Sequence, residues 1–256
     1  MTRTTRRSGG RFCNHLIRNM VLSLIAKRHG IKVDYFSHSR IRDTLGVTLH
    51  SGARTFHGSG VALTDESAYR LLTDATATVD SNLIAKNVFF QTQVLTDLIV
   101  RELNTESQMT NVKQCNPFRQ RYGRNRDLFV HVRLGDVRRM GKNLPFEYYS
   151  TLIAAAEYDN LHIASDSLKH PFITRLLSEF PEGQLCRKEP IKTLQFGSTC
   201  KHIILSHGSF SAVLGYLAFD SKTIVYHKCY NDRRKWHNEG LFQRKGWKEV
   251  DFDRLR

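Results

Sequence analysis

Three loops in this 256-residue chain carry residue types that suit the binding of a phosphate-like anion. In the first loop, residues 9–15, Gly10 lets the backbone approach a ligand closely, while Arg11 and Asn14 offer hydrogen-bond donors. The loop leads into a helical pattern, and the backbone N–H groups at the start of a helix attract anions. An ordinary capped helix start explains the same residues equally well.

The second loop ends an apolar strand pattern and covers residues 130–136. Alternation along the strand puts His131 and Arg133 on one side and the valines on the other. Arg133 comes at the carboxyl end, where its planar guanidinium suits a diphosphate, and Asp136 follows within reach for acid–base chemistry. A plain ion pair between Arg133 and Asp136 is the alternative interpretation.

The third set of residues follows two further strand patterns, at 161–164 and 202–205. Serine hydroxyls at the start of the helix after the second strand could bind phosphate oxygens. A serine at a helix start is common, so each hydroxyl alone is weak evidence. The side chains that this set offers to a ligand are those of Ser165, Asp166, His207, Ser209, Phe210 and Ser211.

Strands that alternate with helices must position these loops. In the N-terminal part, hydropathy predicts strands at 31–36 and 61–63. It also predicts a helix that Asn14 caps and Gly30 ends, and two further helices at 64–72 and 87–103. The second half predicts strands at 128–132, 161–164, 202–205 and 223–226, and helices at 145–157, 170–180 and 209–217. This alternation predicts an α/β fold with parallel strands, whose ligands bind beyond the carboxyl ends.

A polar stretch without periodicity, residues 104–126, is interpreted as the boundary between two halves. We therefore expect two domains, residues 1–115 and 116–256. The five cysteines form no C-x-x-C pair and the histidines show no metal-ligand spacing, which argues against a disulfide framework and a metal site. With no apolar run long enough to span a membrane, we expect a soluble, cytoplasmic protein.

The positive charge of the chain is concentrated in two windows. The net charge of +15 divides into +9 for residues 1–42, −3 for 43–115, +6 for 116–142 and +3 for 143–256. Two basic islands favour two loops that meet at a phosphate-bearing ligand over a uniform nucleic-acid coat. A nucleic-acid-binding protein without catalysis stays open as an alternative. It would use the arginines of the N-terminal tail and of the 119–126 cluster on the backbone, with Phe118 and Tyr122 stacking on bases; the arginines are Arg3, Arg6, Arg7, Arg119, Arg121, Arg124 and Arg126.

Together the three loops resemble the fucosyltransferase superfamily of GT-B glycosyltransferases, which includes α-1,2-, α-1,6- and protein O-fucosyltransferases and small soluble viral and bacterial enzymes. Residues 10–15 (Gly-Arg-Phe-Cys-Asn-His) are similar to the superfamily's G-R-F-G-N-Q opening, and residues 131–136 (His-Val-Arg-Leu-Gly-Asp) to its H-x-R-R-x-D motif. Ser165-Asp166 and residues 206–211 look like the S-D and N-S-S-F-S segments that follow. The order and spacing of these segments agree over most of the chain.

The resemblance implies two Rossmann-like lobes with a donor-binding cleft between them: an acceptor-side lobe of residues 1–115 and a nucleotide-sugar-binding lobe of residues 116–256. It implies an inverting, metal-independent transfer, without cofactor, of a sugar from a GDP- or UDP-linked donor to a glycan or glycoprotein acceptor. Arg133 would bind the diphosphate and Asp136 is the candidate base. The other donor-binding residues would be Gly10, Arg11, Asn14, His131, Ser165, Asp166, His207, Ser209, Phe210 and Ser211.

The chain departs from the superfamily's pattern at several positions. Leu134 replaces the second arginine of the motif, which leaves UDP-xylose as plausible a donor as GDP-fucose. His15 and His207 stand where the pattern has glutamine and asparagine. The superfamily also has an apolar strand before the glycine loop, whereas residues 2–8 contain no apolar residue, so we expect that strand to be poor or truncated. A viral member of this type would work in the host cytoplasm. A relative that binds glycans without turnover is a further possibility.

Overall fold

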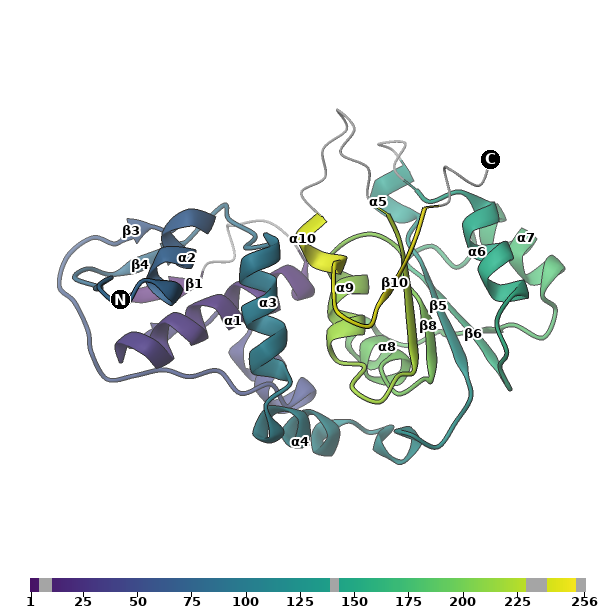
Figure 1. Cartoon of the computed structure of the whole chain (residues 1–256), viewed down its shortest axis with the longest axis horizontal. Coiled ribbons are helices and arrows are strands. Elements are labelled where there is room, and N and C mark those ends of the chain that lie inside the picture. Colours follow the sequence, from purple (N-terminus) through teal and green to yellow (C-terminus); the bar gives the residue numbers. More distant parts are fainter. Residues whose placement is uncertain (5–10, 139–142, 229–238, 252–256) are drawn as a thin grey trace. The chain divides into compact units, whose positions relative to one another are not determined.

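A computed structural model describes residues 1–4, 11–138, 143–228 and 239–251 of the chain. Two compact units make up the chain, and each contains a sheet whose described strand pairs are all parallel (Figure 1). The first unit comprises Met1–Cys115 and Glu239–Leu241, and the second comprises Asn116–Asn238 and Phe242–Arg256. No helix in the described part of the chain is long and apolar enough to cross a membrane.

The sheet of the first unit has the order β2-β1-β4-β3. Its strands are β1 (Thr2–Thr4), β2 (Val33–Asp34), β3 (Val61–Ala62) and β4 (Leu83–Ala85). β1 is only three residues long, but it is present and pairs with both β2 and β4. A threonine can take this central place because the Thr2 hydroxyl, which is buried, accepts a hydrogen bond of 3.0 Å from the Leu83 N–H.

The helices of the first unit are α1 (Phe12–His29), α2 (Asp65–Thr73), α3 (Gln93–Leu103) and α4 (Glu106–Cys115), with a short π-helical turn, η2 (Arg40–Thr44). Gly30 ends α1 with φ +66°, as predicted. Arg11 holds the N-cap position, so the expectation that Asn14 caps this helix is wrong. α3 begins later than predicted because Asn87 and Phe90 adopt positive φ angles, which a helix does not accept.

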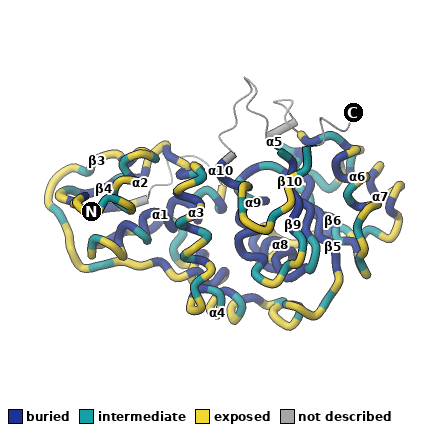
Figure 2. Tube along the Cα trace, viewed as in Figure 1, coloured by how far each residue is buried: buried dark blue, intermediate teal, exposed yellow. Residues whose placement is uncertain are grey.

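The sheet of the second unit has the order β10-β9-β8-β5-β6-β7, that of a doubly wound Rossmann domain. Its strands are β5 (Leu128–Val132), β6 (Leu161–Ser165), β7 (Gln184–Leu185), β8 (His202–Ile204), β9 (Thr223–His227) and β10 (Lys248–Val250). All five residues of β5 are buried (Figure 2), as the continuous apolar run predicts for a central parallel strand. The short strands β7 and β10 complete the two edges.

Helices cover both faces of this second sheet. The helices of the second unit are α5 (Gly135–Arg138), α6 (Phe146–Ala154), α7 (Pro171–Glu179), α8 (Pro190–Gly197) and α9 (Ser209–Tyr216), with the short η3 (Arg119–Arg121) before β5. A further short helix before β10, α10 (Glu239–Phe242), has its first three residues in the first unit. Val130 and Val132 pack in one apolar cluster with residues of α6 and α7. Phe129 points to the other face, where its ring meets that of Phe196 in α8 at 6.3 Å. The alternation along β5 therefore places the side chain of His131 on the face of α8 and α9.

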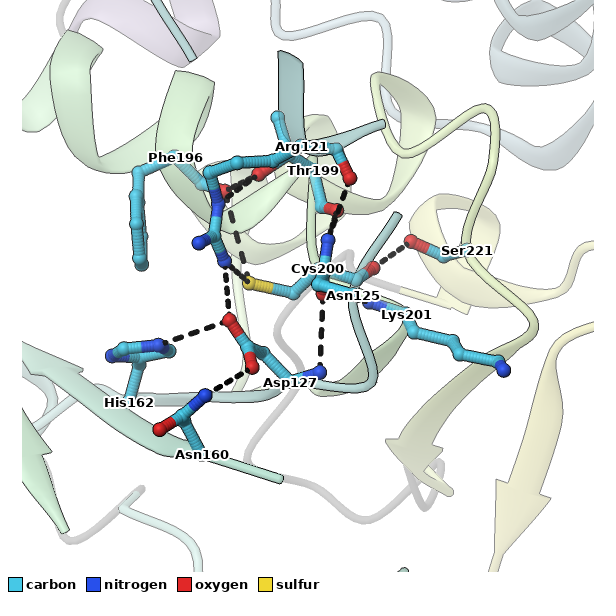
Figure 3. Close-up of polar contacts among 10 residues, drawn as sticks. All are labelled: Arg121, Asn125, Asp127, Asn160, His162, Phe196, Thr199, Cys200, Lys201 and Ser221. Atoms are coloured by element: carbon cyan, nitrogen blue, oxygen red, sulfur yellow. Dashed lines mark hydrogen bonds and ion pairs between the residues drawn. The ribbon is translucent and has the colours of Figure 1, made fainter. Parts of the chain in front are cut away.

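A buried carboxylate fastens the segment that enters β5 to the sheet (Figure 3). Asp127 Oδ2 lies 2.6 Å from the Arg121 guanidinium and 3.3 Å from His162 Nε2, and Oδ1 accepts a 2.8 Å hydrogen bond from Asn160. The Arg121 guanidinium also lies over the Phe196 ring, 4.4 Å from its centroid. Burial alone would raise the pKa of Asp127, but the bonds from Asn160 and Arg121 lower it, so this carboxylate stays charged.

Candidate active site

The predicted loops of the second unit meet where its strand order reverses. The chain leaves β5 towards β6 on one side, and leaves β8 towards β9 on the other, so a crevice is expected beyond the carboxyl ends of β5 and β8. Residues 133–136 follow β5 and residues 205–208 follow β8. The topology therefore places Arg133 and the start of α9 at the position where ligands bind in open α/β sheets.

Arg133 is held by contacts on two sides. Its Nε and Nη2 atoms donate to the Asp136 carboxylate at 3.0–3.2 Å, the ion pair that the sequence left as an alternative. Its Nη1 edge lies against the backbone of Gly208, where a Cβ atom would collide with it. Gly208 also has φ +88° and ψ 172°, a conformation that only glycine adopts readily. Gly208 thus suits both the local backbone conformation and the present position of the Arg133 guanidinium.

Three polar side chains beneath Arg133 fix the two loops to each other. The Ser206 hydroxyl accepts a 3.3 Å hydrogen bond from the Arg133 N–H, and the Ser211 hydroxyl accepts one of 3.0 Å from the Ser206 N–H. Ser211 Oγ lies 2.6 Å from His131 Nδ1. Burial lowers the pKa of His131 to about 4; the charge of Asp166 opposes this shift and that of Arg133 adds to it, so the ring is neutral at pH 7. His131 and Ser211 are buried and position the loops; their contact with a ligand stays a prediction.

Asp166 anchors the loop that carries Arg133. Its Oδ1 accepts hydrogen bonds from the backbone N–H groups of Leu134 at 2.8 Å and Gly135 at 3.0 Å. A Cβ atom at position 135 would lie only 2.6 Å from Asp166 Oδ2, so glycine is needed there for the close approach. The Ser165 side chain bonds to its own loop, because its hydroxyl accepts a 3.1 Å hydrogen bond from the Ser167 N–H. Asp166 therefore preorganises the loop, while its contact with the donor stays a prediction.

The start of α9 adds a second source of positive potential beside Arg133. Ser209 and Phe210 form its first turn and are half-buried, and the Phe210 ring lies 4.7 Å from the His131 ring. The N–H groups of this turn and the helix dipole favour a negative group at this end. A guanidinium next to a helix start is an arrangement that can bind a phosphate group and stabilise charge that develops on it.

Histidines from two adjacent strands border the same edge of the sheet. His207 follows β8 and His227 ends β9, with 6.1 Å between their ring centroids. Burial lowers the pKa of His207 to about 4, with further contributions from His227 and Arg133, so His207 is neutral at pH 7. Sequence reasoning missed His227 because it belongs to no motif. Its place at the end of an apolar strand next to β8 was the available signal.

The first predicted loop lies in the other unit. Gly10 falls outside the described residues. The Arg11 carbonyl accepts the N–H groups of Asn14 and His15, at 2.9 and 3.3 Å, and the Asn14 side-chain oxygen accepts a 3.0 Å bond from Gln91. Asn14 follows β1 and Gln91 follows β4, the two central strands, so this pair lies beyond the carboxyl ends of that sheet. Sequence reasoning also did not single out Arg18, an arginine of α1 that is buried. Burial lowers the pKa of its guanidinium to about 10.

Three of the residues proposed for nucleic-acid binding, Arg121, Phe118 and Tyr122, make contacts within the fold. Arg121 pairs with Asp127, the Phe118 ring packs edge-on against Phe196 at 5.3 Å, and the Tyr122 hydroxyl accepts a 2.9 Å bond from Asn116. These side chains are therefore poorly placed to stack on bases. Within the described ranges, no group of three or more His, Cys, Asp or Glu side chains could hold a metal ion.

Comparison with known proteins finds similarity in fold but none in sequence family. No protein-family model matches the chain, and no curated protein matches its sequence. Several solved chains match in fold, among them structures of the fucosyltransferase NodZ. The NodZ α-1,6-fucosyltransferase co-crystallised with GDP has a TM-score of 0.51, 15% identity, and a match over 89% of this chain and 94% of its own. The selenomethionine form of fucosyltransferase NodZ from Bradyrhizobium has a TM-score of 0.52 with the same identity and coverage. The chain thus has the GT-B α/β fold of the fucosyltransferase NodZ.

Proposed function

We propose that this protein is a glycosyltransferase that moves a sugar from a nucleoside diphosphate sugar to a hydroxyl of a glycan or glycoprotein. The observation that carries the proposal is Arg133, which is fixed between Asp136 and Gly208 at the strand-order reversal, beside the start of α9. The NodZ structure of the same fold was co-crystallised with GDP, which supports a nucleoside diphosphate as the ligand.

The reaction follows from where charge develops. The acceptor oxygen forms a bond to the anomeric carbon while the bond from that carbon to the diphosphate oxygen breaks, and the electron pair leaves with the diphosphate. A single displacement of this kind inverts the anomeric configuration. Arg133 and the first-turn N–H groups of α9 would stabilise the departing diphosphate more strongly than the bound donor, which lowers the barrier. Asp136 would accept the proton of the acceptor hydroxyl.

The sugar and base of the donor follow less directly from the structure. Leu134 stands at the position of the superfamily's second arginine, and its side chain is buried in the apolar cluster under α6. One cation is therefore absent from the loop, and the remaining phosphate contacts fall on Arg133 and on α9. We propose fucose from GDP-fucose or xylose from UDP-xylose as the transferred sugar.

Nucleotide binding tests the proposal. The chain should bind GDP or UDP, and the matching sugar nucleotide, in calorimetric titrations, and Arg133→Ala should weaken that binding at least tenfold. The matched control is Arg187→Ala, which removes an exposed arginine of the same unit away from the loops described above. A wild-type protein that binds none of these nucleotides would refute the proposal, and so would an Arg133→Ala variant that binds them unchanged.

Turnover distinguishes an enzyme from an inactive relative. Release of GDP or UDP from the donor should rise when a suitable glycan acceptor is added, and Asp136→Asn should slow it. Tight donor binding without acceptor-dependent release over a broad glycan panel would point to a glycan-binding relative without catalysis.

A further inference from the structure

A cavity of about 450 Å³ opens at the end of the second sheet opposite to Arg133. The first residues of four strands line it: Leu128 of β5, His202 of β8, Thr223 of β9 and Lys248 of β10. Because all four strands are parallel, this is the amino end of the sheet, whereas the candidate active site lies at the carboxyl end. The cavity is therefore separate from the donor site and large enough for a small organic ligand.

The floor of the cavity is apolar. Leu128, Ile204 and Val225 contribute it from the sheet, and Leu152 and Ala156 from the region of α6. Leu128 and Ile204 belong to the apolar cluster that α6 and α7 cover, so the cavity begins where the cover of α6 ends. An apolar ligand body could continue the packing of that cluster, because removing such surface from water is favourable.

The rim of the cavity is basic. Arg126, Lys201, Lys222 and Lys248 line it, together with a single carboxylate, Glu157. Glu157 lies 3.5 Å from Arg126, so its charge is already paired. In the described ranges, no carboxylate comes within 4.0 Å of the ammonium groups of Lys201, Lys222 or Lys248. His202 lies among these cations. Burial lowers the pKa of its ring, and the charges of Lys201, Lys222 and Arg126 lower it further.

We propose that this basic cavity binds an organic phosphate that carries an apolar or aromatic body. Three unpaired ammonium groups at one mouth suit a phosphate, which accepts several charge-assisted hydrogen bonds, and the floor suits the apolar part. The phosphate group belongs either to a free small molecule or to the headgroup of a lipid. The site is independent of the proposed transfer reaction and can be tested without any sugar nucleotide.

Binding of 1-naphthyl phosphate to the full chain, followed by its fluorescence anisotropy, tests the proposal. We expect saturable binding that exceeds that of 1-naphthol or inorganic phosphate at least tenfold. Excess GDP should leave the bound probe in place. Absence of binding at ~1 mM probe, or displacement of the probe by GDP in a one-to-one manner, would overturn the proposal.

Two sets of variants locate the probe. Lys201→Glu with Lys222→Glu should weaken binding at least tenfold, whereas Lys169→Glu with Lys192→Glu makes the same charge change at exposed sites outside the cavity and should not. Ala155→Trp fills the mouth and should abolish binding. The neighbouring Ala154→Trp leaves the cavity open and is its control. Equal losses in test and control variants would overturn the proposal.

Vesicles distinguish the two sources of the phosphate. Flotation with phosphatidic acid vesicles that is lost in the Lys201/Lys222 variant would identify a lipid headgroup. Probe binding without flotation would identify a soluble phosphate. Binding of duplex DNA that displaces the probe and falls steeply with salt would show a surface for nucleic-acid backbones, and would overturn the small-ligand proposal.

Discussion

Replacing Gly208 by alanine tests whether the placement of Arg133 governs nucleotide binding. The change has two separable costs. The first is backbone strain: with φ +88° and ψ 172°, residue 208 lies in a region that costs a residue with a side chain roughly 1–3 kcal/mol. In a protein of this size each kcal/mol lowers the melting temperature by about 2–4 °C. We therefore expect the variant to melt several degrees lower but to fold.

The second cost falls on Arg133. The new Cβ atom would collide with Nη1, so the guanidinium must move by more than ~1 Å, away from the loop that follows β8. A displacement of that size at a preorganised site can cost roughly a hundredfold. We expect GDP affinity, measured by calorimetry well below the melting temperature, to fall by ten- to a hundredfold.

Gly246→Ala separates strain from displacement. Gly246 has φ +86°, almost the angle of Gly208, but nothing lies within 4 Å of the Cβ position. This control should lose stability and keep its affinity for GDP. The reasoning is refuted if a folded Gly208→Ala variant binds GDP as the wild type does, or if Gly246→Ala loses as much affinity.

Three further changes address other groups. Asp136 holds the guanidinium edge that a diphosphate would use, so Asp136→Asn should tighten GDP binding several-fold in calorimetry while it slows turnover; unchanged affinity would contradict this competition. Asp127→Ala leaves Arg121 unpaired and should lower the free energy of unfolding by about 2–3 kcal/mol in urea titrations, whereas the exposed Asp159→Ala should change it by less than ~0.5 kcal/mol. His131 and His207 stay neutral in the fold down to about pH 4, but the unfolded chain gains their protons below about pH 6.5, so the urea midpoint should fall as the pH drops through that window; a flat profile would contradict the pKa values, and His131→Gln should flatten it in part.

The sequence predicted the central strands well and the edges poorly. β5 and β9 are apolar runs whose two faces are both covered, so their pattern is local and visible. β7 has two residues and β10 reads Lys-Glu-Val, and each is a strand only because a neighbour pairs with it. α4 was missed for a related reason: only Gln108 and Val112 of its ten residues are buried, which is too few for a helical period to show.

The site was predictable by position but not by contact. Residues at the carboxyl ends of parallel strands converge whatever their side chains, so the loops of Arg133, Asp166 and Ser209 could be brought together from the sequence. The hydrogen-bond and packing partners of each side chain could not be predicted from the sequence. That Asp166 anchors two backbone N–H groups 31 and 32 positions away, or that Gly208 makes room for Arg133, depends on packing between distant segments.

The distribution of charge shows the same limit in another form. The basic window at 116–142 was interpreted as one of two islands that meet at a phosphate-bearing ligand, yet Arg121, Arg126 and Arg133 all lie within 4 Å of carboxylates. Residues 143–256, with a net charge of only +3, supply the lysines of the basic cavity. No described carboxylate lies within 4.0 Å of their ammonium groups. Net charge along the chain counts carboxylates that are close in sequence, whereas potential at a site depends on those close in space. Arg133 can bind a diphosphate because of how Gly208 and α9 present it, and the +15 of the chain is not the reason.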